Sequence, residues 1–197
     1  MQTNKMLNIL LLAAGSSSRL GEPKQLLIFH ENALIYHAAS RALELTSYVT
    51  VVLGHESQKC RDALKNLPVT LVVNENYKAG MGNSIAFGAS KLNDNARVLI
   101  MLCDQPLISL SHYNSLIQTS ALYPDMIVAS KYKTNFGVPA LFPNCYLAKL
   151  RQLEGDKGAK AILQNEPLES VPLDVNEAKD IDTQEAWIEV SKLYAKQ

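Results

Sequence analysis

The chain has 197 residues, of which 47% are hydrophobic and 19% charged, so a disordered protein is excluded and one domain with a substantial core is expected. Lys plus Arg equals Asp plus Glu at 19 each, which gives a formal net charge of zero. A general electrostatic hold on nucleic acid or on an anionic membrane needs a basic face, so this balance argues against both partner classes. A net charge of zero is compatible with a small, locally basic pocket.

The N-terminus and the cysteines indicate the compartment. The first residues superficially resemble a short signal peptide, because a lysine precedes an apolar run and then small residues. That run is too short to span a membrane, and the basic residues behind it favour the first strand of a sheet. Cys60, Cys103 and Cys145 are widely spaced and form no CxxC pair. They predict reduced thiols in a cytoplasmic protein.

In the first half of the chain, short apolar runs alternate with helical patterns. The runs are nearly continuous in Val, Ile and Leu, which is typical of strands covered on both faces. This alternation predicts an α/β fold with three α/β/α layers and a doubly wound, mostly parallel, Rossmann-like sheet. In such sheets, ligands lie beyond the carboxyl ends of the strands. The predicted strands are 7–13, 48–53, 69–73 and 97–102, and the predicted helices are about 33–44, 56–66, 82–91 and 111–122.

The second half is less regular. Strands are predicted over 125–129 and 138–142, a helix over 157–164, an extended segment over 168–173 and a last helix over about 183–195. Pro139 predicts an edge strand or a strand start. In the last helix Trp187, Val190 and Tyr194 share one face, which favours Trp187 as a core anchor over a stacking platform for a ligand. No repeat or linker is seen, so residues 1–197 are expected to form a single domain.

The stretch "LLLAAGSSSRLGEPKQLL", residues 10–27, begins in the first predicted strand and continues into a polar turn. Ala14 and Gly15 let a ligand approach the backbone closely, and successive N–H groups in such a turn form a concavity for anions. Ser16, Ser17 and Ser18 add hydroxyl donors, while Arg19 and Lys24 add positive charge suited to a polyphosphate. The spacing is neither a P-loop nor GxGxxG. Taken alone, a polar turn with solvated basic residues explains the stretch equally well.

Two later segments bring carboxylates to the predicted ends of strands. Asp104 in "LCDQP" lies directly after a buried strand, where α/β sheets place ligand groups and where magnesium finds oxygen ligands. Asp180 and Asp182 lie in "DIDTQEAW" before the last helix. Helix N-capping is the alternative role for Asp104 and for Asp182. Two carboxylates from different strand ends could complete a metal site between them.

A glycine-containing turn, "YKAGMGNSIAFG" over 77–88, joins a predicted strand to a helix. Gly80 and Gly82 permit close backbone approach, and Ser84 can hydrogen-bond a base or a sugar. A flexible loop with a helix cap explains this turn about equally well.

Three other chemistries find no support in the sequence. The four histidines are scattered without HxxxH or HExxH spacing, so a zinc site is not expected. No GxSxG elbow for a serine hydrolase is present. Cys103 has no base nearby in sequence and is interpreted as a small core residue rather than a nucleophile.

Taken together, these motifs resemble a known family. The opening stretch resembles the signature LAAGxSxRxGxxKxLL of the MobA-like nucleotidyltransferases, which have a GT-A-like fold. "LCDQP", "GMGNS", "FGVPALF", "GDKGAKAIL" and "DIDT" come in the order typical of the molybdenum cofactor cytidylyltransferase branch. The likeness covers residues 7 to about 187, and the first motif alone is shared with sugar-phosphate and methylerythritol-phosphate nucleotidyltransferases.

The resemblance implies roles for individual residues. Arg19 and Lys24 would bind the triphosphate and act in catalysis together with Asp104. Asp104 and Asp182 would hold Mg²⁺, with Mn²⁺ as an alternative metal. The N-terminal half, about 1–110, would bind the nucleotide, and the C-terminal half, about 111–197, the second substrate. The nucleotide-binding residues implied are Leu12, Ala13, Ala14, Gly15, Arg19, Lys24, Gly80, Met81, Ser84 and Asp104, and those facing the pterin are Gly137, Pro139, Asp156, Lys157 and Gly158.

The reaction implied is transfer of CMP from CTP to the phosphate of molybdopterin, with release of pyrophosphate. The attacking phosphate is already ionised near neutral pH and needs no general base, which agrees with the lack of a convincing catalytic histidine. A molybdenum hydroxylase or its chaperone would receive the product. Guanylyl transfer to molybdopterin, nucleotidyl transfer to a sugar or polyol phosphate, and a noncatalytic nucleotide- or cofactor-binding chaperone module are the alternatives.

Overall fold

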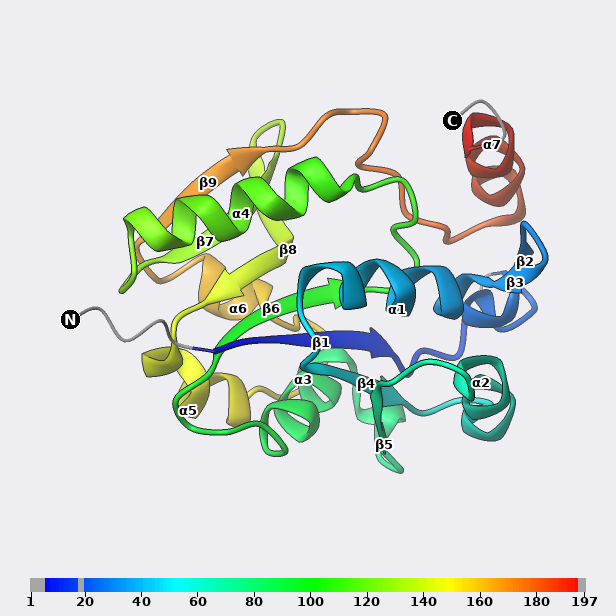
Figure 1. The fold of residues 1–197 in the computed structure, drawn as a ribbon, viewed down its shortest axis with the longest axis horizontal. Helices are drawn as coiled ribbons and strands as arrows, with labels where there is room; N and C mark the ends of the chain where they lie inside the picture. The colour runs from blue at the N-terminus through cyan, green and yellow to red at the C-terminus, as the bar shows by residue number, and fades with distance from the viewer. Residues whose placement is uncertain (1–5, 18–19, 195–197) are drawn as a thin grey trace.

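The structure is a computed structural model that describes residues 6–17 and 20–194. Its longer elements alternate between strands and helices through most of the chain (Figure 1). The strands are β1 (Leu7–Ala13), β2 (Ile28–Phe29), β3 (Asn32–Ala33), β4 (Val49–Leu53), β5 (Thr70–Val73), β6 (Arg97–Leu102), β7 (Ile127–Tyr132), β8 (Asn135–Phe142) and β9 (Leu168–Pro172). The helices are α1 (Leu34–Leu45), α2 (Ser57–Leu64), α3 (Met81–Ala89), α4 (Leu110–Leu122), α5 (Leu147–Arg151), α6 (Lys160–Leu163) and α7 (Gln184–Tyr194), with 3₁₀ turns η1 (Lys24–Leu26), η2 (Tyr77–Ala79) and η3 (Asn144–Tyr146).

The main sheet has seven strands in the order β5-β4-β1-β6-β8-β7-β9. β1 pairs in parallel with both β4 and β6, and β7 pairs in parallel with β9. β8 pairs antiparallel with both of its neighbours, β6 and β7. The prediction of a doubly wound, mostly parallel sheet is therefore confirmed.

The two faces of this sheet carry separate hydrophobic cores. On β1, Ile9 and Leu11 point into a core shared with α1, α2 and α4, whereas Leu10 and Leu12 point into a core shared with α3, α5 and α6. The alternation follows from the period of two along a strand, and burial of both sets explains the continuous apolar run. The predicted three-layer α/β/α architecture is confirmed.

Pro139 is placed differently from the prediction. It lies inside β8, a strand between two others, rather than on an edge strand or at a strand start. The register between β7 and β8 shifts between Ala129 and Ser130, so Pro139 falls in an irregularity where its missing N–H breaks no regular ladder bond. The Ser130 hydroxyl, which is buried, donates to the Pro139 carbonyl over 2.7 Å and satisfies that oxygen.

The last helix, α7, lies toward the end of the sheet to which β1 and β6 point (Figure 1). Val190 is fully buried in a third, smaller core, and Trp187 packs against that core with its ring 5.7 Å from the ring of Phe29. The prediction of Trp187 as a core anchor is confirmed, and the side chain of Tyr194 lies outside the described part of the chain. This small core also holds Leu20 and Leu27, so it fastens the last helix to the segment that follows β1.

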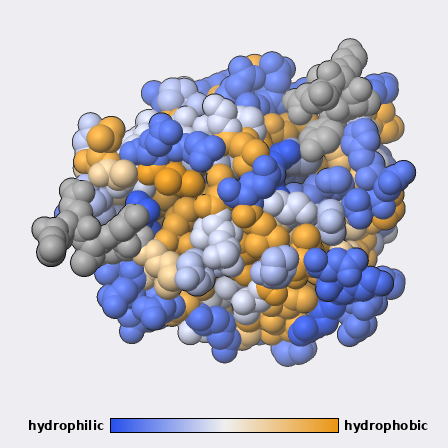
Figure 2. Space-filling view, viewed as in Figure 1, coloured by the Kyte–Doolittle hydropathy of each residue, from blue (hydrophilic) through white to orange (hydrophobic). Residues whose placement is uncertain are grey.

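The surface mixes polar and apolar residues. Hydrophilic side chains gather at the periphery of the face shown in Figure 2, and hydrophobic ones lie between them.

Within the described residues, no helix is both long enough and apolar enough to cross a bilayer. Cys60 and Cys103 are buried and Cys145 is exposed, all three as free thiols.

Gly88 marks the closest approach of α3 to the sheet. A Cβ at this position would lie 2.5 Å from Leu10 Cδ1 and 2.7 Å from Val52 Cγ2, and both neighbours are fully buried. Gly88→Val is expected to lower the free energy of unfolding by about 1–3 kcal/mol, because the added atoms overfill a packed core. Urea denaturation measures the loss. Gly15→Ala, where a Cβ meets nothing within 4 Å, is the control and should shift stability by about 0.5 kcal/mol or less. Equal stability of Gly88→Val and the wild-type chain would contradict the packing argument.

Candidate functional site

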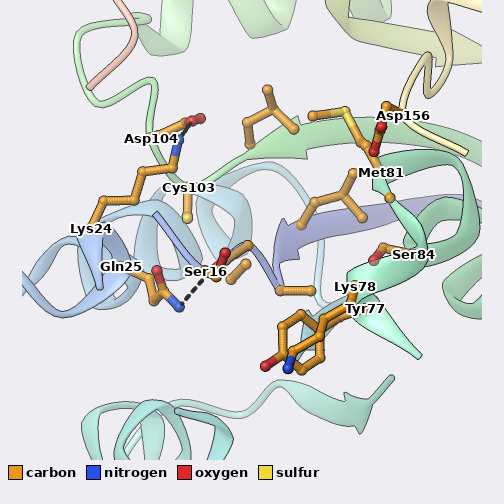
Figure 3. Close-up of a pocket in the computed structure, with 16 residues that line it drawn as sticks. Ser16, Lys24, Gln25, Tyr77, Lys78, Met81, Ser84, Cys103, Asp104 and Asp156 are labelled. Atoms are coloured by element: carbon orange, nitrogen blue, oxygen red, sulfur yellow. Dashed lines mark hydrogen bonds and ion pairs between the residues drawn. The ribbon is translucent and has the colours of Figure 1, made fainter. Parts of the chain in front are cut away.

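A cavity of about 420 Å³ opens where β1 and β6 end (Figure 3). Its position agrees with the rule that ligands of open α/β sheets lie beyond the carboxyl ends of the strands. Many residues singled out from the sequence line it, although they come from segments far apart in the chain. They are Leu12, Ala13, Ala14, Gly15, Lys24, Gly80, Met81, Ser84, Asp104 and Asp156.

The turn after β1 is held from two sides. Gln25 is almost fully buried, and its Nε2 donates to the Gly15 carbonyl over 3.1 Å and to the His55 carbonyl over 3.3 Å. The His55 N–H donates to the Ala14 carbonyl over 3.1 Å. A Cβ on Gly54 would lie 2.7 Å from that same Ala14 oxygen, so only glycine lets the two turns approach this closely. The floor of the cavity is therefore fixed before any ligand arrives.

Lys24 lies between two carboxylates at one end of the cavity. Its Nζ donates to Asp104 Oδ2, and it lies 3.0 Å from Asp182 Oδ1. The side chains of Lys24 and Asp104 are 17% and 13% exposed, so this pair is shielded from water, whereas Asp182 is 39% exposed. Three residues predicted separately for phosphate and metal binding thus meet at one point.

Backbone contacts explain how distant segments meet there. Cys103, directly after β6, donates its N–H to the Leu12 carbonyl over 3.2 Å, which places Asp104 beside the end of β1. The Ile181 N–H donates to the Asp104 carbonyl over 3.0 Å and brings Asp182 alongside.

Neither aspartate serves as a helix cap. The hydroxyl of Thr183 accepts from the Ala186 N–H at the start of α7, and the hydroxyl of Ser109 accepts from the His112 N–H at the start of α4. Thr183 and Ser109, rather than Asp182 and Asp104, therefore cap these helices, and both carboxylates contact Lys24.

The charge state of Lys24 follows from these neighbours. Burial alone would lower the pKa of Lys24, but the charge and hydrogen bonds of Asp104 and Asp182 outweigh burial and raise the pKa above its ordinary value. The amine is therefore protonated throughout the neutral range.

Asp104 also offers a free oxygen. Its Oδ1 is buried and has no hydrogen-bond partner among the described residues, which is an unusual arrangement for a carboxylate. Asp104 and Asp182 supply two carboxylates, and no group of three or more His, Cys, Asp or Glu side chains suited to a metal occurs in the described ranges. Mg²⁺ is commonly held by one or two carboxylates plus substrate phosphates, so this donor set fits such an ion.

A hydrogen-bonded network supports the acidic end from behind. Gln105 Nε2 donates to Asp180 Oδ1 over 2.8 Å and to the Tyr132 hydroxyl over 3.1 Å, and that hydroxyl donates to the Val138 carbonyl. Burial, followed by the charge of Asp104, raises the pKa of Asp180. Asp180 is thus held by Gln105.

The residues expected to face the second substrate are dispersed. Asp156 lines the cavity, but Gly137, Pro139, Lys157 and Gly158 are not among its lining residues. Gly158 packs against Met81, since a Cβ there would lie 2.9 Å from the Met81 sulfur. Asp182 contacts Lys24 but is not among the residues that line the cavity. Arg19, also predicted for the site, lies outside the described residues.

Gln25, Tyr77 and Lys78 also line the cavity, although no role was predicted for them from the sequence. Ser16, predicted as a hydroxyl donor, and Cys103, assigned to the core, line it as well. Tyr77 and Lys78 come from η2, at the start of the glycine-containing segment 77–88, which was selected for Gly80, Gly82 and Ser84 rather than for these two side chains. Gln25 resembles any other polar residue of a loop in the sequence. Burial raises the pKa of the Cys103 thiol, in agreement with its interpretation as a structural residue.

Comparisons with known proteins identify relatives of similar length. The purine catabolism protein PucB of Bacillus subtilis (strain 168) is 29% identical over 89% of this chain and 91% of its own length. Nicotine blue oxidoreductase of Paenarthrobacter nicotinovorans is 30% identical, with the same coverage of both chains. The crystal structure of Rv0371c from Mycobacterium tuberculosis H37Rv has a TM-score of 0.84 at 24% identity, covering 96% of this chain and all of that one.

A second structure of Rv0371c, solved in complex with manganese, has a TM-score of 0.81 at 21% identity and covers 96% of this chain and all of that one. These likenesses establish the fold. The family model of the MobA-like NTP transferase domain matches residues 9–171, most of the chain. The chain therefore belongs to the MobA-like NTP transferase family and is a nucleotidyltransferase.

Proposed function

We propose that the chain transfers CMP from CTP to the phosphate of molybdopterin and releases pyrophosphate. The observation that carries this proposal is the contact of Lys24 with Asp104 and Asp182 at one end of the cavity, which is lined by the turn after β1. Family membership supports nucleotidyl transfer, and the "LCDQP", "GDKGAKAIL" and "DIDT" segments favour the cytidylyl branch.

The proposed reaction forms one P–O bond and breaks another. An ionised phosphate oxygen of molybdopterin attacks the α-phosphorus of CTP, and the bond to the β-phosphate breaks as pyrophosphate leaves. No base is needed, and no histidine is among the residues that line the cavity in the described part of the chain. Lys24, held protonated, neutralises the charge that develops on the triphosphate, and the turn of Ala13 to Gly15 positions the triphosphate.

A divalent cation completes this proposal. Asp104 and Asp182 would hold Mg²⁺, or Mn²⁺ in its place, and the ion would supply charge neutralisation at the phosphates. Arg19 would assist Lys24 at the triphosphate. The unpartnered Oδ1 of Asp104 supports this role, because a buried carboxylate oxygen without a donor is costly unless a cation or a ligand satisfies it.

The second substrate is proposed to enter from the C-terminal half of a single domain. Gly137, Pro139, Lys157 and Gly158 would face the pterin and its phosphate, while residues up to about 110 hold the nucleotide. Both hydrophobic cores draw residues from both halves, which supports one folding unit. A molybdenum hydroxylase or its chaperone would receive the product in the cytoplasm.

Turnover with each of the four nucleoside triphosphates tests the proposal. With molybdopterin and Mg²⁺, pyrophosphate release is expected to be at least about tenfold faster with CTP than with GTP, ATP or UTP. Faster turnover with GTP or ATP would overturn the cytidylyl assignment. Turnover with a sugar or polyol phosphate but not with molybdopterin would overturn the acceptor, and CTP binding without any turnover would favour the chaperone module.

A further inference from the structure

On the basis of the nucleotide site proposed above, we infer that Asp156 selects the base. Its carboxylate would accept a hydrogen bond from the exocyclic amino group of the base. Asp156 is not part of the turn after β1 or of the acidic pair, and it belongs to a loop between α5 and α6. Asp156 would thus contact the nucleotide rather than the second substrate. The end of the cavity where Asp156 lies also carries the hydroxyl of Ser84.

The two ends of the cavity differ in charge. Lys24 and Asp104 lie on one side of it, and Asp156, Met81 and Ser84 lie on the opposite side (Figure 3). Lys24 and Lys78 both line the cavity, and Lys24 is the lysine beside the carboxylates proposed to hold Mg²⁺, so we place the phosphates beside Lys24. The base of an extended nucleotide is then directed toward Asp156.

The carboxylate of Asp156 is free to accept a hydrogen bond there. It lines the cavity and makes no hydrogen bond or ion pair with any of the described residues. Its loop is packed tightly against the start of α3. The Gly82 N–H donates to the Gly155 carbonyl over 2.8 Å, and a Cβ on Gly80 would lie 2.5 Å from Asp156 Oδ1. Glycine at position 80, with its positive φ of 108°, lets the carboxylate lie against the turn.

Ser84 supplies a donor beside this acceptor. The side chain of Asn74 is fixed in orientation, since its Oδ1 accepts from the Asn76 N–H over 3.0 Å. Asn74 Nδ2 therefore donates to Ser84 Oγ over 3.1 Å. With its oxygen accepting from Asn74, the Ser84 hydroxyl keeps its own hydrogen to donate to a ligand in the cavity that Ser84 lines.

An acceptor next to a donor matches the edge of cytosine. The N4 amino group can donate to Asp156, while N3 or O2 accepts from Ser84. Uracil carries a carbonyl oxygen where cytosine carries the amino group, so the Asp156 carboxylate would face another acceptor. Such a mismatch leaves both oxygens without a donor, which is how hydrogen-bonding sites reject close analogues.

Asp156→Asn tests this inference, because an amide can donate to the uracil carbonyl and a carboxylate cannot. We expect the ratio of kcat/KM for CTP to kcat/KM for UTP to fall by about tenfold or more, with CTP binding weakened in calorimetry. Glu154→Gln is the matched control. Glu154 is an exposed acid of the same loop that does not line the cavity, and its removal should leave the ratio unchanged.

The outcomes separate this inference from the proposed function. A CTP-to-UTP ratio in Asp156→Asn equal to that of the wild-type chain would overturn the base-reading role. A rise in KM for molybdopterin alone, with the nucleotide ratio intact, would overturn it as well and place Asp156 at the second substrate. If the wild-type chain turned over neither CTP nor UTP, the proposed function would fail, whatever the variant does.

Discussion

Replacing Asp104 with asparagine is expected to lower turnover by about 10²–10³-fold, the loss typical when one preorganised electrostatic contact is removed from a transition state. Asparagine has the size and shape of aspartate but no charge, so it weakens both the hold on a divalent cation and the ion pair with Lys24. Pyrophosphate release at saturating CTP and molybdopterin, over a Mg²⁺ titration, measures the effect. The Mg²⁺ concentration for half-maximal rate should rise as the maximal rate falls.

Asp180→Asn is the matched control for this experiment. Asp180 is a nearby carboxylate held by Gln105 rather than by Lys24, and its loss should lower turnover by less than about tenfold. Circular dichroism and thermal unfolding establish that both variants fold. Unchanged Mg²⁺-dependent turnover in Asp104→Asn would show that this carboxylate does not hold the metal.

Much of the architecture could be predicted because local patterns determine it. β1 and β6 are continuous apolar runs, and such runs favour strands that are buried on both faces, as in a parallel sheet between helices. The short elements of the second half are different. Pro139 is tolerated inside β8 by a register shift against β7, which depends on the partner strand and leaves no trace near Pro139 in the sequence.

The candidate site was predictable where chemistry and strand ends coincide. Lys24 and Asp104 stand out because charged residues come shortly after buried strands. Gln25 could not be recognised in this way, since its role consists of hydrogen bonds to the backbone of Gly15 and His55, which only the folded chain brings near. Asp156 was associated with the second substrate by resemblance, and its packing on Gly80 arises from a contact between distant segments.

Lys24→Met is expected to have two opposite effects. Turnover should fall by about 10²–10³-fold, because the methionine leaves the charge on the triphosphate without a partner. Binding of Mn²⁺ without nucleotide should tighten by about tenfold or more, since the Lys24 amine bound between Asp104 and Asp182 repels a second cation at these carboxylates. Mn²⁺ binding is measured by electron paramagnetic resonance on the protein alone.

Lys78→Met separates this local contact from a general change in charge. Lys78 also lines the cavity but has no ion pair with a described residue, so its removal lowers the local positive charge without freeing a carboxylate. Mn²⁺ affinity should change little in Lys78→Met and strongly in Lys24→Met. An equal gain in Mn²⁺ affinity in both variants would mean that the overall electrostatic potential of the cavity governs metal binding. Tighter Mn²⁺ binding in Lys24→Met alone would mean that the lysine and the metal share the same two carboxylates. A bound triphosphate would then draw Lys24 toward itself and free these carboxylates for the cation that accompanies it.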